Sequence, residues 1–151
     1  MPALDLLFIG LKSMTKSASQ RGRSARAKGA AFERQIANAL NDELGINLRR
    51  NLKQYQVNEE GDLVDDTGKF PFDIECKAYA DGTGLKPAWW AQALASSERS
   101  KKIPAVIYKY DRRPVRVAIP LSAVFEDPHG QVIEMDLDTF TYIAREIMSD
   151  D

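Results

Sequence analysis

Residues 70–79 place acidic and basic side chains at every second position of an otherwise apolar run. In an extended strand successive side chains alternate between two faces, so Asp73, Glu75 and Lys77 would share one face, about 7 Å apart. Two carboxylates beside an ammonium group could bind a divalent cation and activate a water molecule. A solvent-exposed strand could alternate in the same way, so this interpretation depends on matching residues elsewhere. The intervening positions are apolar and would face a core: Phe72, Ile74 and Cys76.

The chain has 151 residues, a length suited to one domain with one core. Its apolar fraction of 44% and charged fraction of 28% are those of an ordinary globular protein. One cysteine and one histidine exclude a disulfide framework and a zinc cluster, and we expect Cys76 to be a small core residue. No apolar run is long enough to span a membrane, and residues 4–11 lack the features of a signal peptide. We therefore predict a cytoplasmic protein without a membrane partner.

Charge is distributed unevenly along the sequence, although the net charge is only −1. Residues 121–151 hold eight of the 22 acidic residues and one of the 21 basic residues. Residues 1–120 therefore hold 14 acids and 20 bases, a balance of +6 against −7 for the C-terminal segment. A basic body is typical of proteins that bind a polyanion, although it is a weak indication alone.

Residues 12–28 contain six basic residues, and no acidic residue occurs between Asp5 and Glu33. Serine and glycine fill the intervening positions, so we predict a flexible basic arm over residues 1–24 that becomes helical near residues 23–28. Such an arm could contact phosphates or could only keep the chain soluble. We favour phosphate contact, by Arg23, Arg26 and Lys28, because the arm leads directly into the first helix.

The pattern of apolar residues predicts a helix from about residue 25 to residue 44, ended by Gly45. Glu33 falls at the border of the apolar stripe. Its carboxylate either reaches solvent or is held near the core for a purpose, and the pattern alone favours solvent. The residues expected in the buried stripe are Phe32, Ile36, Ala37, Leu40 and Leu44.

Two short strands are expected between this helix and the strand at residues 70–79. The first lies within residues 46–52, with Arg49 and Arg50 at the rim of the sheet, and the polar residues Lys53 and Gln54 follow it. The second covers residues 61–64, and a tight turn at residues 65–68 reverses the chain. This hairpin would bring Asp62 beside the acids of the third strand, so a third carboxylate would join the row.

The remaining sequence predicts a second helix followed by further strands and short elements. The helix begins at residues 86–90, with Pro87 in its first turn. Its spacing directs Trp90 toward the core and Trp89 and Gln92 toward another face, where they could line DNA or pack. The later elements are strands at 103–110 and 115–119, a short helix at 121–125, a strand at 132–135 and a helix at 137–148.

Five ordered segments make the sequence resemble the PD-(D/E)xK nuclease superfamily, whose members share the restriction-endonuclease-like fold. Within it, the likeness is to small phage and prophage endonucleases related to Holliday-junction resolvases. The resemblance spans about residues 25–120 and implies an α/β fold, with an αβββαβ core and a central mixed β-sheet flanked by helices. Residues 25–151 would form one nuclease domain that ends in the acidic segment 121–151. The matching segments are residues 28–34, 49–52, 61–62, 72–77 and 87–92.

The resemblance also implies which residues would hold a metal ion. Asp62 and Glu75 would bind Mg²⁺, for which Mn²⁺ would substitute, and Glu33 would be a further ligand, directly or through water. Lys77 would orient or deprotonate the attacking water and offset charge on the phosphate. The adjacent proline–aspartate pair typical of the family is absent here. Asp73 therefore stays a second candidate for the first acid, or a residue that supports the ligands.

These features predict a metal-dependent DNA endonuclease of phage or prophage type, acting as a homodimer in a phage-infected or lysogenic bacterial cell. A non-catalytic DNA-binding module with the same fold is the alternative, and an α/β domain with a salt-bridged sheet face is a third. Acids beside a phosphate site repel DNA unless a cation intervenes, which favours the enzyme. The residues predicted to contact DNA are Arg23, Arg26, Lys28, Arg49, Arg50, Lys53, Gln54, Trp89 and Gln92.

Overall fold

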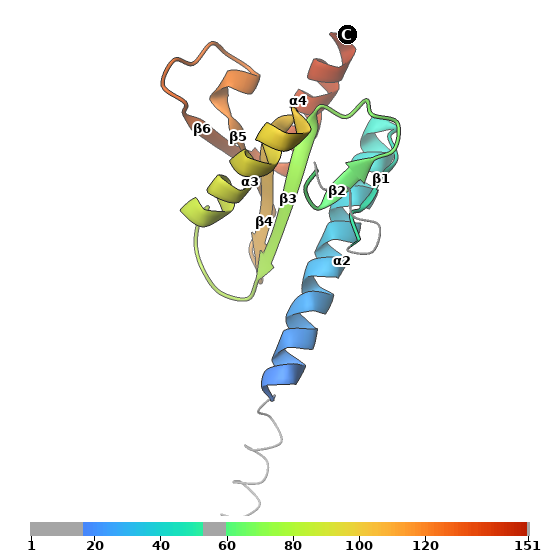
Figure 1. The fold of residues 1–151 in the computed structure, drawn as a ribbon, viewed down its shortest axis with the longest axis vertical. Coiled ribbons are helices and arrows are strands. Elements are labelled where there is room, and N and C mark those ends of the chain that lie inside the picture. Colours follow the sequence, from blue (N-terminus) through green and yellow to red (C-terminus); the bar gives the residue numbers. More distant parts are fainter. Residues whose placement is uncertain (1–16, 53–59, 151) are drawn as a thin grey trace, which may run out of the picture.

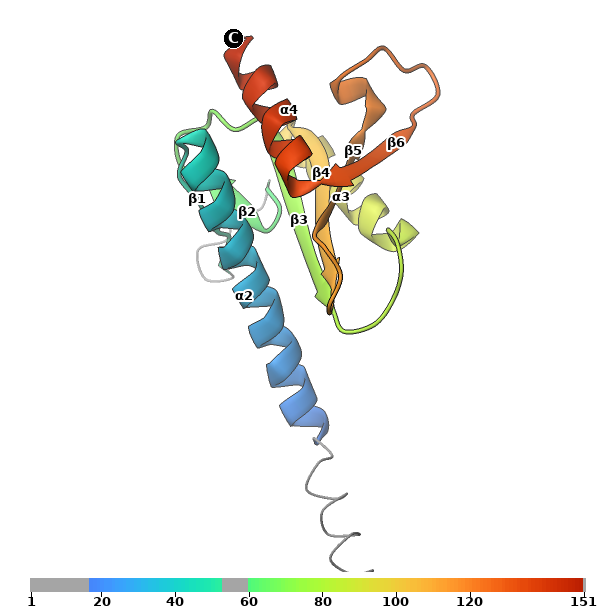
Figure 2. The same ribbon diagram turned by 180° about the vertical axis from the view of Figure 1, so that it is seen from behind.

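The computed structural model describes residues 17–52 and 60–150, which Figures 1 and 2 show from opposite sides. Within the described residues, the elements from α2 to β4 have the predicted order αβββαβ, and β5, η2, β6 and α4 follow them. Residues 1–16 of the predicted basic arm lie outside the described residues. The bounds are α2 Ala18–Leu44, β1 Leu48–Arg50, β2 Leu63–Asp65, β3 Phe72–Tyr79, α3 Pro87–Ser100, β4 Ile103–Tyr110, β5 Arg116–Pro120, the 3-10 turn η2 Leu121–Ala123, β6 Val132–Asp136 and α4 Leu137–Ser149.

A four-stranded mixed sheet in the order β3-β4-β5-β6 forms the centre of the fold. β3 runs parallel to β4, with Phe72 opposite Ile103, whereas β4, β5 and β6 are antiparallel to one another in turn. A parallel pair requires a crossover connection, and α3 provides it. Both faces of this pair are covered, which explains why β4 is apolar along nearly its whole length.

Helices cover both faces of the sheet, as the two opposite views show (Figures 1 and 2). α2 and α4 lie on one face, where the larger core cluster contains Phe72 and Ile74 of β3. α3 lies on the other face, above a smaller cluster that is rich in aromatic residues. β3 therefore has an apolar side toward α2 and a polar side toward α3. The buried residues of the smaller cluster are Trp89, Ala93, Val106, Tyr108, Tyr110 and Ala118.

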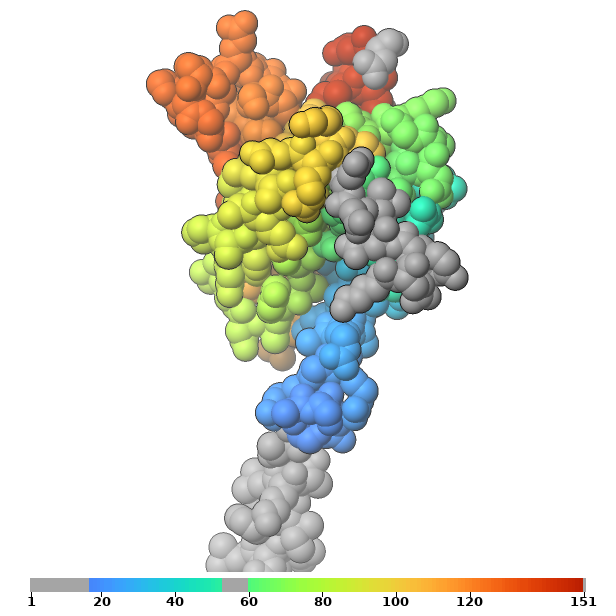
Figure 3. All heavy atoms as spheres, viewed as in Figure 1, coloured from blue at the N-terminus to red at the C-terminus, as the bar shows by residue number. Residues whose placement is uncertain are grey.

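Helix α2 ends as predicted and begins earlier than predicted. Gly45 ends it with a left-handed φ of 64°, and its amide donates to Asn41 O. Ser17 forms a capping box with Gln20, so residues 18–24 are helical where the sequence predicts a flexible arm. The described residues 18–31 contain no buried side chain, and the first turns of α2 extend beyond the body in Figure 3. The predicted stripe is confirmed, with Phe32, Ile36, Ala37 and Leu40 buried and Leu44 packed against them.

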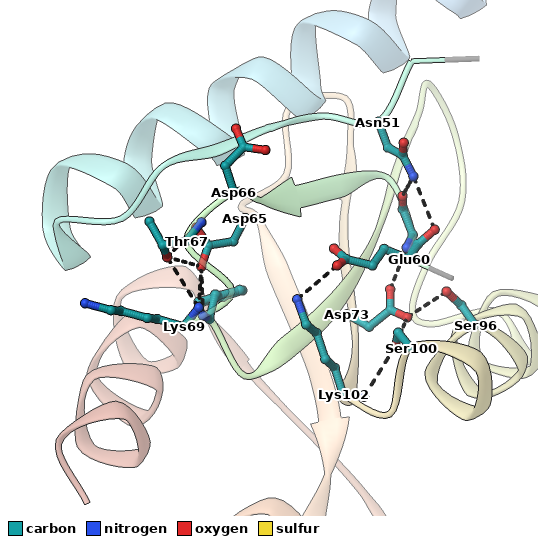
Figure 4. A network of polar contacts seen from close by, with 12 residues as sticks. Asn51, Glu60, Asp65, Asp66, Thr67, Lys69, Asp73, Ser96, Ser100 and Lys102 are labelled. Atoms are coloured by element: carbon teal, nitrogen blue, oxygen red, sulfur yellow. Dashed lines mark hydrogen bonds and ion pairs between the residues drawn. The ribbon is translucent and has the colours of Figure 1, made fainter. Parts of the chain in front are cut away.

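The small two-stranded sheet corrects one prediction of strand pairing. β2 forms an antiparallel ladder with β1, in which Arg49 is opposite Val64, instead of a ladder with β3. All three residues of β2 are buried, and β1 packs on α2, so this pairing satisfies the backbone of β2 within the core. A backbone hydrogen bond of 2.8 Å from Asp62 N to Ile74 O still joins the start of β2 to β3. The turn between them is held by the Asp65 carboxylate, which accepts from Thr67, Lys69 and Phe70 (Figure 4).

Helix α3 reverses the predicted roles of its two tryptophans. Trp89 is buried with Ala93 and Ser96, whereas Trp90 is only partly buried. Ala93 shares a helical face with Trp89 and also with Trp90, so helical spacing does not decide which tryptophan is buried. The small side chains of Ala93 and Ser96 let α3 approach β3 closely. With 6% of its surface exposed, Trp89 belongs to the core and offers little surface to DNA.

The C-terminal elements occur where the sequence predicts them. β6 extends the sheet, and Asp136 then caps α4 by accepting a 2.8 Å hydrogen bond from Thr139 N. α4 packs against α2 and the sheet with Phe140 and Ala144. In the part of the chain that the structure describes, no helix has the length and apolarity needed to cross a membrane.

Candidate active site

The row of charged residues on β3 lies beneath helix α3 rather than in solvent. Asp73 and Glu75 are 1% and 4% exposed, and Lys77 is half-buried at the edge of the helix. Phe72 and Ile74 point the other way into the larger core, as the alternation predicts. Because the row is covered, a solvated strand face does not explain its charges.

Asp73 anchors the loop that precedes β2. Its Oδ1 accepts a hydrogen bond from Gly61 N at 2.8 Å. Its Oδ2 accepts from Ser96 Oγ at 2.7 Å and from Ser100 Oγ at 2.6 Å, both on α3 (Figure 4). Donors from the protein thus engage both oxygens of this buried carboxylate. Asp73 therefore positions the loop at Gly61.

Gly61 passes so close to β3 that a larger residue would displace the loop. A Cβ there would lie 2.5 Å from a backbone oxygen of β3 and 2.6 Å from Asp73 Oδ1. This approach brings Asp62 alongside β3, where its Oδ2 accepts from Cys76 N at 2.7 Å. From the other side, Asn51 N donates to Asp62 O at 2.9 Å. The position of Asp62 is therefore determined by the loop at Gly61, by Asn51 and by β3.

The carboxyl groups of Asp62 and Glu75 meet where this loop contacts β3. Burial, followed by the negative charges of Asp62 and Asp73, raises the pKa of Glu75 to about 8. Burial also raises the pKa of Asp62. A hydrogen bond between the two carboxyl groups raises the pKa of Glu75 further and lowers that of Asp62, so the two groups titrate as a pair.

Gln92 connects this acid pair to the lysine. Its Nε2 donates to Glu75 Oε2 at 3.2 Å, and its Oε1 accepts from Lys77 Nζ at 2.8 Å. One amide therefore sets the orientation of both side chains from the first turns of α3. The sequence suggests Gln92 as a DNA contact, and the structure places it inside the site.

Glu33 reaches the edge of the site from α2 and is held there by Arg50. The Arg50 Nε lies 2.7 Å from Glu33 Oε2, and both side chains are largely covered. After burial, the charge of Glu33 is a further cause of the raised pKa of Asp62, so the two carboxylates are near each other. Within residues 17–52 and 60–150, no three His, Cys, Asp or Glu side chains converge as metal ligands. Asp62 and Glu75 form the carboxylate pair of the site, and Glu33 lies at its edge.

The chemistry of the donors fits a hard divalent cation. Asp62 and Glu75 offer carboxylate oxygens whose negative charge is poorly solvated, and such oxygens are what Mg²⁺ binds. Burial raises the pKa of the neighbouring Cys76 thiol well above its ordinary value, so no thiolate competes as a soft ligand. The donors thus fit a hard divalent cation better than a soft one.

A cleft of about 540 Å³ opens in front of these residues. The exposed turns of α2 form one wall, to which Arg21, Ser24 and Lys28 contribute. The site and the end of β3 form the opposite side. A strand of a polyanion lying in this cleft would pass between the basic turns of α2 and the side that holds Asp62 and Lys77. The residues on the side of β3 include Asp62, Lys77 and Tyr79, and Glu33 of α2 also lines the cleft.

The other residues predicted to contact DNA fall into three groups. Arg23 and Arg26 are exposed on the first turns of α2. Lys28, Arg49 and Arg50 form ion pairs with Asp111, Asp66 and Glu33, respectively. The first two pairs are exposed, and exposed pairs of this kind contribute only about 0–1 kcal/mol to stability. Lys53 and Gln54 lie outside the described residues.

The residues that hold the acids in place are those that sequence reasoning missed. Asn51, Ser96 and Ser100 make hydrogen bonds to the loop at Gly61 or to Asp73. They are small polar residues in ordinary contexts, and the two serines lie 23 and 27 positions from Asp73. The only signal was indirect, since a buried Asp73 requires donors from whatever element covers β3.

The raised pKa of Glu75 predicts how stability depends on pH without metal. The folded protein keeps the Glu75 proton up to about pH 8, whereas the unfolded chain releases it near the ordinary value of 4.5. The folded state therefore binds more protons in this interval, and we expect the free energy of unfolding to fall as pH rises from 5 to 8. The slope would be at most on the order of 1.4 kcal/mol for each pH unit. Urea unfolding in chelator at several pH values measures it.

Two comparisons make this pH prediction specific. Glu75→Gln should flatten the dependence, because the amide does not titrate. The pKa values of Asp65, Asp111 and Asp136 are lowered, so their contributions are lost only in acid, outside the interval. A metal-free stability that is constant or rises between pH 5 and pH 8 would contradict the crowded acid pair.

The fold and the site together define the class of this protein. An αβββαβ core that brings an aspartate to a Glu-x-Lys sequence on its third strand is the arrangement of PD-(D/E)xK nucleases. A family model described as "Phage putative PDDEXK endonuclease" matches residues 24–149. The chain therefore belongs to this family of phage endonucleases, and the match extends through most of the acidic C-terminal segment.

Comparisons with individual proteins add little to what the family match shows. No curated protein matches the chain. Among solved structures, the chain is similar to Hjc of Archaeoglobus fulgidus, a Holliday junction resolvase from an archaeal hyperthermophile, with 18% identity and a TM-score of 0.47. The similarity covers 80% of this chain and 98% of that one. It is too distant to transfer a function.

Proposed function

We propose that the protein is a metal-dependent endonuclease that hydrolyses phosphodiester bonds of DNA. The observation that carries this proposal is the pair formed by the half-buried Asp62 and the buried Glu75, with Lys77 two positions further along β3 and linked to Glu75 through Gln92. Hydrolysis of a phosphodiester needs a nucleophilic water, a polarised phosphate and stabilisation of the leaving oxygen. A divalent cation held by the two carboxylates supplies these.

The residues of the site divide this work. Asp62 and Glu75 would hold Mg²⁺, for which Mn²⁺ would substitute, and Glu33 would contribute through water. Binding the cation requires Glu75 to lose the proton that it shares with Asp62, so metal affinity increases with pH. Asp73 carries the loop that presents Asp62 and is a positioning residue.

Lys77 is the residue that would act directly on the reacting groups. Lys77 lines the cleft, and its Nζ donates a hydrogen bond of 2.8 Å to Gln92 Oε1. An ammonium group there would offset the charge that develops on the phosphate and orient the attacking water, whereas the neutral amine would take a proton from that water. Because Lys77 is not a metal ligand, its removal separates chemistry from metal binding.

Charge explains how DNA would reach the site. The exposed turns of α2 carry Arg21, Arg23 and Arg26 and no acid, and they form one wall of the cleft. The acids on the other side repel phosphates unless a cation lies between them. A pure DNA-binding module has no use for such acids, so this alternative is less consistent with the site. We propose that the exposed arginines position the DNA backbone and that the ion-paired cations exchange partners with phosphates.

The proposed setting follows from the substrate. Phage DNA lies in the cytoplasm of an infected or lysogenic cell, and we place the enzyme there. A homodimer would match a four-way junction, whose two equivalent strands need two symmetric cuts. Sedimentation of the protein with and without such a junction would measure this assembly.

We expect the protein to cut DNA in Mg²⁺ or Mn²⁺, and chelation to stop the reaction. Lys77→Ala should lower the cleavage rate at least about a hundredfold, because it removes a preorganised charge beside the phosphate. The same variant should still bind metal in a calorimetric titration at an affinity near that of the wild type. Cleavage of branched, linear and single-stranded DNAs, measured in parallel, defines the preferred form.

Lys69→Ala is the matched control for this experiment, since Lys69 is exposed on the turn after β2, away from the cleft. Its activity should equal that of the wild type. If no DNA form is cut in either metal while DNA still binds, the protein is a non-catalytic binding module.

A further inference from the structure

Tyr79 continues the row of residues that carries the proposed chemistry. Glu75, Lys77 and Tyr79 occupy alternate positions of β3, so they lie on the same face with about 7 Å between neighbours. Tyr79 is 45% exposed and lines the same cleft as Lys77 and Asp62. The proposed function gives this aromatic side chain no task.

A buried aromatic cluster supports the ring of Tyr79 from behind. Its ring stacks on that of Trp89, with 5.3 Å between centroids and 15° between planes. Trp89 in turn contacts Tyr108 and Tyr110, at centroid distances of 5.7 and 6.0 Å. The backbone is fixed as well, because Tyr79 O accepts from Asp111 N at 3.0 Å. The ring is thus held in place before any ligand arrives.

Lys86 lies beside this stack and does not cap it. Its Nζ is 5.6 Å from the Tyr79 centroid and 5.5 Å from the Trp89 centroid. A cation over the outer face of Tyr79 would be much further from Trp89 than from Tyr79. The near-equal distances therefore place the ammonium at the side of the two rings, where it could meet a phosphate of a strand whose base covers Tyr79.

We propose that Tyr79 is a stacking platform for a nucleobase of the substrate, next to the phosphate that is cut. This inference rests on the proposed nuclease function and names its substrate class: DNA with an unpaired or extruded nucleotide at the site. A base inside a continuous duplex is already stacked on both faces and cannot cover a protein ring. A rigid aromatic ring in a basic cleft is how proteins bind the bases of single strands without reading their sequence.

Binding in chelator tests the platform without cleavage. We would use a duplex that carries a single-stranded flap, with 2-aminopurine in place of a base near the branch, and the continuous duplex of the same sequence. The wild type and Tyr79→Phe should quench the probe in the flap, because both offer an aromatic ring. Tyr79→Leu should not quench it and should bind the flap about tenfold more weakly, with duplex affinity unchanged. Leucine fills similar space over Trp89, and thermal unfolding of the variant verifies that it folds.

Tyr142→Leu is the matched control, since Tyr142 is 59% exposed on α4, across the sheet from α3. It should behave as the wild type with both DNAs. If Tyr79→Leu resembles this control, or weakens flap and duplex equally, the platform does not exist. Cleavage in Mg²⁺ is measured separately. A wild type that cuts no DNA overturns the nuclease proposal, whereas a wild type that cuts both forms with Tyr79→Leu unaffected overturns only the stacking proposal.

Discussion

Replacing Glu75 by glutamine is expected to lower the rate of DNA cleavage at least about a thousandfold while leaving the protein folded. The amide keeps the shape of the side chain and its hydrogen bond with Gln92, but it cannot supply the negative charge that holds a divalent cation. Asp62→Asn should have an effect of the same size, because the two carboxylates act as one site. Single-turnover cleavage at saturating Mg²⁺ measures the rate, and a metal titration measures the lost binding.

The stability of the same variant distinguishes a lost ligand from a damaged fold. Above pH 7, metal-free Glu75→Gln should be more stable than the wild type, because it no longer has to bury or protonate a carboxylate. Glu98→Gln serves as the control, because it alters an exposed acid on α3. It should change neither activity nor stability. A Glu75→Gln enzyme that cuts DNA at more than a tenth of the wild-type rate would remove Glu75 from the metal site.

Asp73→Ala is expected to lower the free energy of unfolding by at least about 3 kcal/mol. The substitution leaves Gly61 N and the hydroxyls of Ser96 and Ser100 without their acceptor in a buried place, and each such donor costs about 1–3 kcal/mol. Loss of the anchor also releases Asp62, so cleavage should fall together with stability. Urea unfolding at constant pH measures the first effect.

Asp73→Asn separates these two consequences. Its Oδ1 can still accept from Gly61 N, and the serine hydroxyls can turn to accept from its amide, so we expect a smaller loss of stability and substantial remaining activity. Asp62→Asn should show the reverse, with little loss of stability and no activity. A stable but inactive Asp73→Asn, together with an active Asp62→Asn, would show that Asp73 is the first metal acid.

Much of the fold was accessible from the sequence because its strongest patterns are local. The apolar spacing and Gly45 predict the end of α2, and the alternation in residues 70–79 predicts which residues of β3 face the large core. Pairing of β2 was predicted wrongly because a turn sequence shows only that the chain reverses. Which neighbouring strand completes the ladder depends on how β1 packs against α2, and that contact is not encoded within either strand.

Less of the site than of the fold could be predicted from the sequence, because the site depends on contacts between different elements. Asp62, Glu75 and Lys77 follow from the motif and from proximity through the turn. The role of Asp73 does not follow, because its partners Ser96 and Ser100 come from α3, a different element. The pairing of Glu33 with Arg50 likewise joins two segments whose approach is set by the whole core.

The two unlike sides of β3 also determine how this strand can pair with β4. If β3 slipped by one residue in its parallel register, Asp73 and Glu75 would turn into the apolar layer beside Phe140, and Phe72 would turn toward the polar side. Burying a carboxylate there without partners costs several kcal/mol, so the slipped pairing is excluded as the sheet forms. The acids of the site therefore act during folding as well as in the folded enzyme. A chain that has closed this sheet correctly has, in the same event, placed Glu75 on the side of β3 that faces Asp62 and Gln92.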